Sequence, residues 1–313
     1  MSFNHKHLLG IEQLSAEDIL YVLEQAKSFR EISRRPKKKV PTLQGKTAVL
    51  AFFEPSTRTR VSFEMAAKRL SADTYSISSS GSSVVKGETL IDTVRNLEAM
   101  KIDLVIMRHG SSGAHNFLSR HIESPIINAG DGYHEHPTQA LLDMLTIQEA
   151  RGTLSGLKVA IIGDITHSRV AHSNIIGLTK MGSDVHLAGP YTMIPRYVER
   201  LGQPAERVRV FPRVEQAIEG VDVVMAIRIQ RERMPKHLFP SNREYAMTFG
   251  LNLDNIKYAK DDATIMHPGP INRGVEMTPD LADCGRSVIL EQVDNGVAIR
   301  MALIYLLMGG KGE

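Results

Sequence analysis

The segment FEPSTRTR, from Phe53 to Arg60, gathers hydroxyl and guanidinium groups between a strand-like apolar run and a helix-like pattern. We expect Ser56 to cap a helix that begins near Thr57, where backbone N–H groups and a partial positive charge can bind an anion. Arg58 and Thr59 add further donors beside that helix start. The set suits a small anion, with phosphate as the best candidate. A capped helix with surface arginines is the alternative, although capping alone needs fewer donors.

A second segment, HEHPTQALLD, carries side chains that could form hydrogen bonds with a carbonyl and an amide group. His136 precedes a helix that begins with Pro137, and Gln139 lies one turn inside that helix. A histidine can donate to a carbonyl oxygen, and a glutamine carries both a donor and an acceptor. The alternatives are a second helix cap or a metal pair made of His134 and His136. No further His or Cys set has ligand spacing, so we expect no metal and no cofactor.

Three other segments carry arginines at or just after the ends of strand-like runs. Arg108, in MRHG, could reach the same anion as the first segment. Arg169 follows the run KVAIIGD, and Arg228 and Gln230, in RIQRER, share one side of an extended segment. Guanidinium groups bind carboxylates through a two-pronged fork. The first half of the chain is therefore predicted to bind phosphate, and the second half one or more carboxylates.

Two loops could complete such a site. The stretch SSSGSSVVKGET ends near Lys86 and is either a flexible linker or a mobile loop that brings a cation over a site. In HPGPINRG, Pro268 and Pro270 flank Gly269 and restrict the backbone. The carbonyl oxygens of that segment could accept hydrogen bonds from an amide group.

The elements that must position these residues alternate between strand and helix. Strands are expected at TAVLAFF, TYSIS, DLVIMRH and PIINAG in the first half, and at KVAIIGD, DVHLAGP, RVRVF, DVVMAIR and ATIMHP in the second. Uniformly apolar strands separated by helices are typical of parallel sheets covered on both faces. We predict an α/β fold of two doubly wound parallel-sheet domains, 1–150 and 151–290, joined near RGTLSGL. The last helical pattern, 291–313, is expected to pack back on the first domain.

Almost every motif falls where a predicted strand ends. Open parallel sheets bind ligands outside the carboxyl ends of their strands. If the two domains face each other through these edges, the active site lies in the cleft between them.

Composition limits the classes of partner and compartment. The 313 residues include 38 basic and 35 acidic side chains, a net charge of +3, which is too balanced to favour nucleic acid. The single cysteine, Cys284, excludes an internal disulfide and fits a reducing cytosol. The N-terminus lacks the features of a signal peptide, and no apolar run reaches the roughly 18 residues of a membrane span. We expect a soluble cytoplasmic protein without a membrane partner.

Seven segments occur in order along the chain: FFEPSTRTR, SSVVKGET, MRHG, HPTQALLD, GDITHSRVAHS, RIQRER and HPGPINRG. Together they resemble the catalytic chains of the aspartate carbamoyltransferase family, in the aspartate/ornithine carbamoyltransferase superfamily; seven motifs in sequence are far more specific than one. The resemblance implies transfer of a carbamoyl group from carbamoyl phosphate to L-aspartate. The products would be N-carbamoyl-L-aspartate and phosphate, in de novo pyrimidine biosynthesis.

The resemblance also implies roles for the residues of the first half. The catalytic residues would be Arg58, Thr59, Arg108 and His136. Carbamoyl phosphate would be bound by these four together with Ser56, Thr57, Gln139 and the backbone of Pro268, Gly269 and Pro270. Thr59, Arg108 and His136 would polarise the carbamoyl carbonyl. The departing phosphate would accept a proton from the attacking amine, with His136 as the second choice.

In the second half, the resemblance implies that aspartate is bound by Lys86, Arg169, Arg228 and Gln230. In this family Ser82 and Lys86 reach the site from a neighbouring subunit, which implies a homotrimer or a multiple of trimers. The form HPGPINRG is associated with plain trimers or with a dihydroorotase partner rather than with a regulatory-chain partner.

Two alternatives stay open at this point. Ornithine carbamoyltransferases share the STRTR segment, but they carry a Cys in an HCLP segment and an SMG motif. Here the first segment reads HPGP, Cys284 lies elsewhere, and SMG is absent from the sequence. A non-catalytic binding protein on the same fold would be expected to lack Arg58, Arg108, His136 or Lys86, and all four are present.

Overall fold

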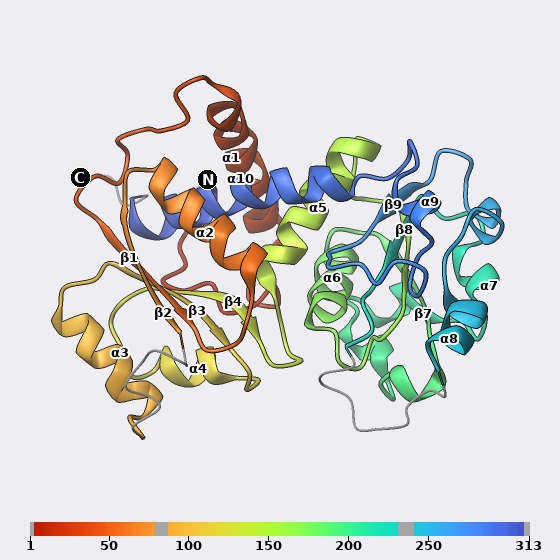
Figure 1. Ribbon diagram of the computed structural model, residues 1–313, viewed down its shortest axis with the longest axis horizontal. Helices are drawn as coiled ribbons and strands as arrows, with labels where there is room; N and C mark the ends of the chain where they lie inside the picture. The colour runs from red at the N-terminus through yellow and green to blue at the C-terminus, as the bar shows by residue number, and fades with distance from the viewer. Residues whose placement is uncertain (1–2, 79–86, 231–240, 310–313) are drawn as a thin grey trace. The chain divides into compact units, whose positions relative to one another are not determined.

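The computed structural model describes residues 3–78, 87–230 and 241–309. Those residues form two compact units, Met1–Leu141 with Asp294–Glu313, and Leu142–Val293. Two helices, α5 (Pro137–Arg151) and α10 (Ile289–Met308), each begin in one unit and end in the other. Each unit is described below by itself (Figure 1).

The first unit contains a four-stranded parallel sheet in the order β2-β1-β3-β4. Its strands are β1 (Thr47–Phe52), β2 (Asp73–Ser78), β3 (Leu104–His109) and β4 (Ile126–Asp131). Its helices are α1 (Ala16–Arg34), α2 (Thr57–Arg69), α3 (Leu90–Ala99) and α4 (Ala114–Leu118). The inner strands β1 and β3 are almost wholly apolar and buried, whereas the edge strand β2 is largely exposed.

The second unit contains a five-stranded parallel sheet in the order β7-β6-β5-β8-β9. Its strands are β5 (Lys158–Ile162), β6 (Asp184–Ala188), β7 (Val208–Val210), β8 (Val223–Ala226) and β9 (Thr264–Met266). Its remaining helices are α6 (Arg169–Lys180), α7 (Val214–Ile218), α8 (Asn242–Phe249) and α9 (Pro279–Ala282). The predicted fold class, two parallel α/β domains, is confirmed.

Strand order identifies one point in each sheet where a ligand crevice is expected. In the first sheet the winding reverses between β1 and β3, and in the second between β5 and β8. At such a reversal the connections leave toward opposite faces and open a crevice beyond the carboxyl ends of the strands. The segment before α2 follows β1, and Arg108 is the penultimate residue of β3. The segments that carry Arg169 and Arg228 follow β5 and β8.

The helix α1 begins at a complete N-terminal cap. Ser15 accepts a hydrogen bond from the Asp18 N–H, and Asp18 accepts one from the Ser15 N–H, which completes a capping box. The helix ends at Arg34, just before the exposed basic run around Pro36.

The later part of α10 packs on the first unit through Arg300. Its Nη1 donates to Ser62 Oγ at 2.8 Å, and its guanidinium carbon lies 5.0 Å from the centre of the Phe63 ring. Nearer the start of α10, Asn295 Oδ1 accepts from Arg30 Nη1 on α1 at 3.1 Å. Arg300 and Asn295 thus hold the later part of α10 against the first unit.

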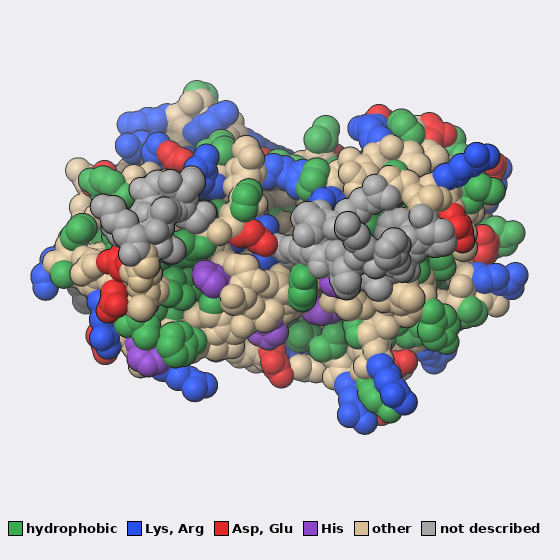
Figure 2. All heavy atoms as spheres, turned by 60° about the horizontal axis from the view of Figure 1, so that its bottom comes forward, with side chains coloured by type: hydrophobic (Ala, Val, Ile, Leu, Met, Phe, Trp, Pro, Cys, Tyr) green, Lys and Arg blue, Asp and Glu red, His purple; other side chains and the backbone are tan. Residues whose placement is uncertain are grey.

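The surface carries mixed charge. Figure 2 shows basic, acidic and apolar side chains interspersed on one face of the molecule, in keeping with the balanced composition. Within the described residues, the helices are all too short or too polar to cross a membrane.

Gly163 directly follows β5 and lies against the backbone that follows β8, so a substitution there measures how closely these two segments pack. Its φ is +141°, and a Cβ there would lie 2.6 Å from the Ile227 carbonyl oxygen. We expect Gly163→Ala to lower the free energy of unfolding by at least about 2 kcal/mol, through backbone strain and overpacking. Gly156→Ala is the matched control: its φ is +75° with no atom within 4 Å, so only the left-handed cost of about 1 kcal/mol applies. Equal losses in urea unfolding would contradict this account.

Candidate active site

The start of α2 is the anion-binding candidate of the first unit. Ser56 occupies the N-cap position in an extended conformation, and its side chain makes no capping hydrogen bond, so this part of the prediction is wrong. The first turn also contains no acidic residue. Thr57 and Arg58 are exposed and Thr59 is buried. The first turn of α2 therefore carries hydroxyl and guanidinium groups and no carboxylate of its own.

Arg108, at the end of β3, is held beside this helix start by Glu54. Arg108 Nε lies 3.0 Å from Glu54 Oε2, and Arg108 Nη1 donates to the Ala129 carbonyl oxygen at 3.4 Å. Arg108 also pairs in register with Phe52, the last residue of β1. A largely buried ion pair of this kind fixes the direction of the guanidinium group. Sequence analysis missed Glu54, although it lies inside the quoted motif.

His136 and Gln139 meet at the start of α5. Both are buried, and the Gln139 and Ala140 N–H groups donate to the His136 carbonyl oxygen at 3.0 and 3.2 Å. His136 thus ends the β4–α5 connection, and Gln139 lies in the first turn after Pro137. The predicted helix with proline at its first position is confirmed, and both side chains belong to the same strand-end region as Arg108.

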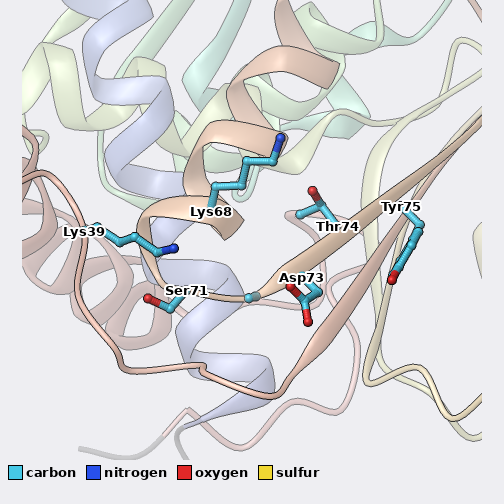
Figure 3. A pocket seen from close by; sticks show the side chains of 7 residues that line it. Lys39, Lys68, Ser71, Asp73, Thr74 and Tyr75 are labelled. Carbon is cyan, nitrogen blue, oxygen red and sulfur yellow. The ribbon is translucent and has the colours of Figure 1, made fainter.

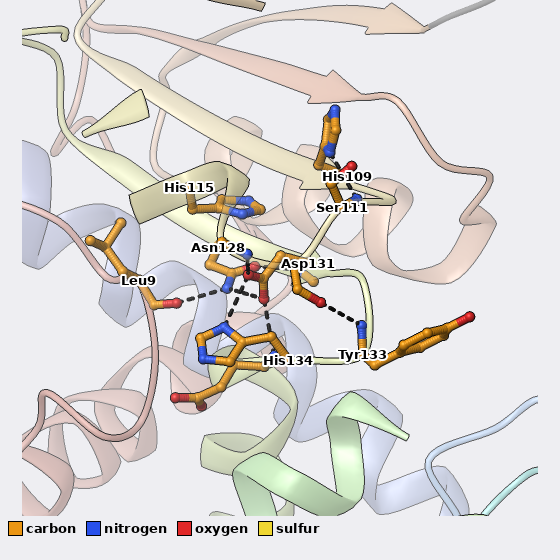
Figure 4. A network of polar contacts seen from close by, with 12 residues as sticks. Leu9, His109, Ser111, His115, Asn128, Asp131, Tyr133 and His134 are labelled. Carbon is orange, nitrogen blue, oxygen red and sulfur yellow. Dashed lines mark hydrogen bonds and ion pairs between the residues drawn. The ribbon is translucent and has the colours of Figure 1, made fainter. Parts of the chain in front are cut away.

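A buried polar network shapes the loop that precedes His136 (Figure 4). The two oxygens of Asp131 accept hydrogen bonds from Gly113 N at 2.8 Å and from Asn128 Nδ2 and Glu135 N at 3.0 Å each. His134 Nδ1 lies 3.0 Å from Asp131 Oδ2. This ion pair raises the pKa of His134, and burial only partly opposes it. Burial acts to raise the pKa of Asp131, but its hydrogen-bond donors outweigh burial and lower it.

Glu135 ties the same loop to the N-terminal segment. Its carboxylate is buried and accepts from the backbone N–H groups of Ile11, at 2.8 Å, and Glu12, at 3.3 Å. A side chain at Gly10 would collide with this carboxylate. The loop before His136 is therefore anchored at both Asp131 and Glu135.

In the second unit, Arg169 is the first residue of α6 and is buried. The Ser168 hydroxyl caps this helix by accepting from Ala171 N at 3.1 Å. The preceding turn is shaped by Asp164, whose carboxylate contacts His167 Nδ1 at 2.9 Å. Burial raises the pKa of Asp164, although hydrogen bonds from His167 and from the Gln230 backbone favour its charged form. Asp164 thus links the turns that carry Arg169 and Gln230.

Arg228 and Gln230 flank a residue whose backbone is fixed by a buried carboxylate. The Ile229 N–H donates to Glu276 Oε1 at 3.0 Å, and Asn272 donates to the same carboxylate through its backbone and side chain at 2.7 Å each. Burial raises the pKa of Glu276 despite these donors. Arg228 and Gln230 are half-buried on either side of the anchored Ile229.

The predicted proline loop follows β9. Gly269 N donates to His267 Nδ1 at 2.8 Å, so that ring nitrogen accepts and carries no proton. Pro268 and Gly269 are half-buried and Pro270 is exposed. The loop therefore has a fixed backbone, as the prolines predict.

Ser82 and Lys86 fall outside the described residues. A cavity lined by Lys39, Lys68 and Asp73 lies near the start of β2 (Figure 3). It is separate from the motifs, which lie at the carboxyl ends of the strands.

Each unit therefore places arginine side chains at or beyond the carboxyl ends of its strands. Carboxylates hold Arg108 in the first unit and the backbone of the arginine-bearing turns in the second. The fold is that of a two-domain α/β protein, and the groups at its strand ends suit small anions. Residues 6–149 match the family model described as the carbamoyl-P binding domain of aspartate/ornithine carbamoyltransferase, and residues 155–307 match its Asp/Orn binding domain. The chain belongs to the aspartate/ornithine carbamoyltransferase family, and the predicted resemblance is confirmed.

Relatives and solved structures agree with this assignment. The chain is 60% identical to the aspartate carbamoyltransferase catalytic subunit of Syntrophotalea carbinolica, covering 99% of this chain and 98% of the relative. The aspartate transcarbamoylase of Trypanosoma cruzi in complex with carbamoyl phosphate and aspartate gives a TM-score of 0.88 at 30% identity, over 96% of each chain. An ornithine carbamoyltransferase from Pyrococcus furiosus gives 0.89 at 32% identity over 100% of both chains. The fold therefore does not separate the two substrate classes.

The His134–Asp131 pair predicts a pH-dependent contribution to stability. Because folding raises the pKa of His134, its contribution is complete below the ordinary value of 6.5 and is lost as pH rises through the raised value. Because folding lowers the pKa of Asp131, its contribution is complete above the ordinary value of 3.8 and is lost as pH falls. The pair stabilises most between these two values.

We therefore expect His134→Gln to lower the urea midpoint more at about pH 5.5 than at about pH 9. The same substitution in an Asp131→Asn background should show a much weaker pH dependence, because the partner charge is absent and only Glu135 and Glu12 still favour the charged His134. A loss that is equal at both pH values in the single variant would show that the pair does not act through charge.

Proposed function

We propose that the chain catalyses transfer of the carbamoyl group from carbamoyl phosphate to the amine of L-aspartate, which gives N-carbamoyl-L-aspartate and phosphate. The observation that carries this proposal is the division of cationic groups between the two sheets. The first unit offers a helix start rich in hydroxyl and guanidinium groups, and the second offers Arg169 and Arg228 in turns fixed by buried carboxylates. Full-length identity to aspartate carbamoyltransferase catalytic subunits supports the choice of aspartate.

The first unit, proposed as the carbamoyl-phosphate domain, would bind the phosphate at the start of α2. The groups assigned to it are Ser56, Thr57, Arg58, Thr59 and Arg108. Backbone N–H groups at a helix start and a bidentate guanidinium both favour a phosphate dianion. Since Glu54 fixes the Arg108 guanidinium, little reorganisation accompanies binding.

The carbamoyl group would lie beside the phosphate. As the amine attacks the carbamoyl carbon, negative charge develops on the carbonyl oxygen, and Thr59, Arg108 and His136 are assigned to stabilise it. Gln139 and the carbonyl oxygens of Pro268–Pro270 would hold the carbamoyl amide group. The C–N bond forms, the C–O bond to phosphate breaks, and the departing phosphate accepts the amine proton.

The second unit, proposed as the aspartate domain, would bind the substrate carboxylates through Arg169, Arg228 and Gln230. Asp164 and Glu276 contribute by holding the backbone of the turns that carry them. Lys86 and Ser82 are assigned to the site from a neighbouring subunit, so the active form is proposed to be a cytoplasmic homotrimer or a multiple of trimers. Its pathway would be pyrimidine biosynthesis, with a dihydroorotase or a regulatory chain as candidate partners.

The phosphate assignment predicts large losses of turnover. Arg58→Ala and Arg108→Ala should each lower kcat by about 10²–10³-fold, because each removes a donor to charge that develops in the transition state. Arg95→Ala is the control, since Arg95 is an exposed arginine on α3. Colorimetric measurement of carbamoyl aspartate checks the result. Wild-type turnover in both variants would refute the assignment.

The aspartate assignment predicts substrate choice. The wild-type protein should carbamoylate aspartate and not ornithine, and Arg228→Ala should raise KM for aspartate about tenfold or more, since a charge-assisted hydrogen bond contributes about 1.5–3 kcal/mol. Its KM for carbamoyl phosphate should change little. Preferential carbamoylation of ornithine by the wild type would instead place the chain with the ornithine enzymes.

A further inference from the structure

Asp143, on α5, is a buried carboxylate that no predicted role uses. Its side chain is 0% exposed. Oδ2 accepts from Asn174 Nδ2 and Oδ1 from Gln292 Nε2, both at 2.8 Å. The two donors are themselves buried and come from different helices, α6 and α10. One carboxylate therefore joins three helices, and Asp143, Asn174 and Gln292 all belong to the second unit.

The first branch leads to the start of α6. Asn174 Nδ2 donates to Asp143 and also to the Val170 carbonyl oxygen, at 3.0 Å, one turn earlier in the helix. Val170 directly follows Arg169, the proposed carboxylate ligand. Asp143 thus holds, through Asn174, the helical turn on which Arg169 is placed.

The second branch leads to the proline loop. Gln292 Oε1 accepts from His267 N at 3.0 Å, and His267 Nδ1 accepts from Gly269 N at 2.8 Å. Because the carboxylate accepts and the His267 N–H donates, the Gln292 amide satisfies both partners in one orientation only. Asp143 thereby fixes that orientation and, through it, the backbone of the loop.

We propose that Asp143 is a positioning residue for both substrates: through Asn174 it places Arg169, and through Gln292 and His267 it places the carbonyl groups of Pro268–Pro270. The proposal rests on the proposed function, which assigns Arg169 to aspartate and the loop to the carbamoyl amide. Placement matters because displacement of a ligand by about 1 Å can cost about 10²-fold in rate.

The direction of the hydrogen bonds gives a specific test. In Asp143→Asn, the new amide nitrogen must face either Asn174 Nδ2 or Gln292 Nε2, and two donors then meet in a buried site. If Gln292 turns over to relieve the clash, its amide faces the His267 N–H instead. In Gln292→Glu, two buried carboxylates meet.

The double variant Asp143→Asn/Gln292→Glu satisfies every one of these contacts. The amide introduced at position 143 would accept from Asn174 through its oxygen. Its nitrogen would donate to the carboxylate introduced at position 292, whose second oxygen would accept from His267 N. The total charge is unchanged. We therefore expect each single variant to lose about 10²-fold in kcat/KM for aspartate, and the double variant to recover to within about tenfold of the wild type.

Variants that remove only one of the two branches distinguish a loss of ligand positioning from a general loss of stability. Asn174→Ala should raise KM for aspartate more than KM for carbamoyl phosphate, and Gln292→Ala should do the reverse. Isothermal titration with N-(phosphonacetyl)-L-aspartate should show weaker binding in both single variants, Asp143→Asn and Gln292→Glu, and recovered binding in the double variant. Binding of inorganic phosphate alone, assigned to the first unit, should stay within about twofold.

The proposal is overturned if Asp143→Asn keeps wild-type kinetics. It is also overturned if the double variant folds no better than the single variants or is no more active, an outcome that remains decisive even where a single variant fails to fold. Failure of the proposed function would look different: the wild-type protein itself would then form no carbamoyl aspartate and bind none of the bisubstrate analogue.

Discussion

The constraint on which the rest depends is the parallel direction of all nine strands in the described residues. Parallel strands bring every carboxyl end to the same edge of a sheet, so motifs far apart in sequence become neighbours without any direct link between them. Each sheet also reverses its winding once, between β1 and β3 and between β5 and β8. The candidate arginines lie at or after the ends of those strands, which explains why they are distributed as short separate motifs and not as one continuous segment.

Acidic residues that contact these arginines, or the backbone next to them, hold the arginines and loops in fixed positions. Glu54 pairs with Arg108, Asp164 and Glu276 hold the turns after β5 and β8, and Asp143 joins α5, α6 and α10. A buried carboxylate is costly unless donors surround it, so each one dictates the path of the backbone that supplies those donors. The side chains and turns assigned to the substrates are thus held in place within each unit before any substrate binds.

The relation to other carbamoyltransferases depends on which parts of the chain the two substrate classes share. Solved aspartate and ornithine enzymes match the chain almost equally well in fold. The scaffold and the helix start proposed to bind phosphate are compatible with both amine substrates. The choice between those substrates is assigned to a few side chains after β5, β8 and β9. Fold similarity supports the shared half of the chemistry, while sequence identity supports the choice of aspartate.

The sequence by itself determined the two parallel α/β domains, the start of α5 at Pro137 and the motifs at the strand ends, because apolar runs and proline or glycine signals are local. It also led to Ser56 at the N-cap, but the expected side-chain hydrogen bond does not form. Only the tertiary structure revealed the partners of Glu54, Glu276 and Asp143. Those contacts join residues up to 149 positions apart, and a carboxylate in a sequence does not indicate which distant donors will surround it once it is buried.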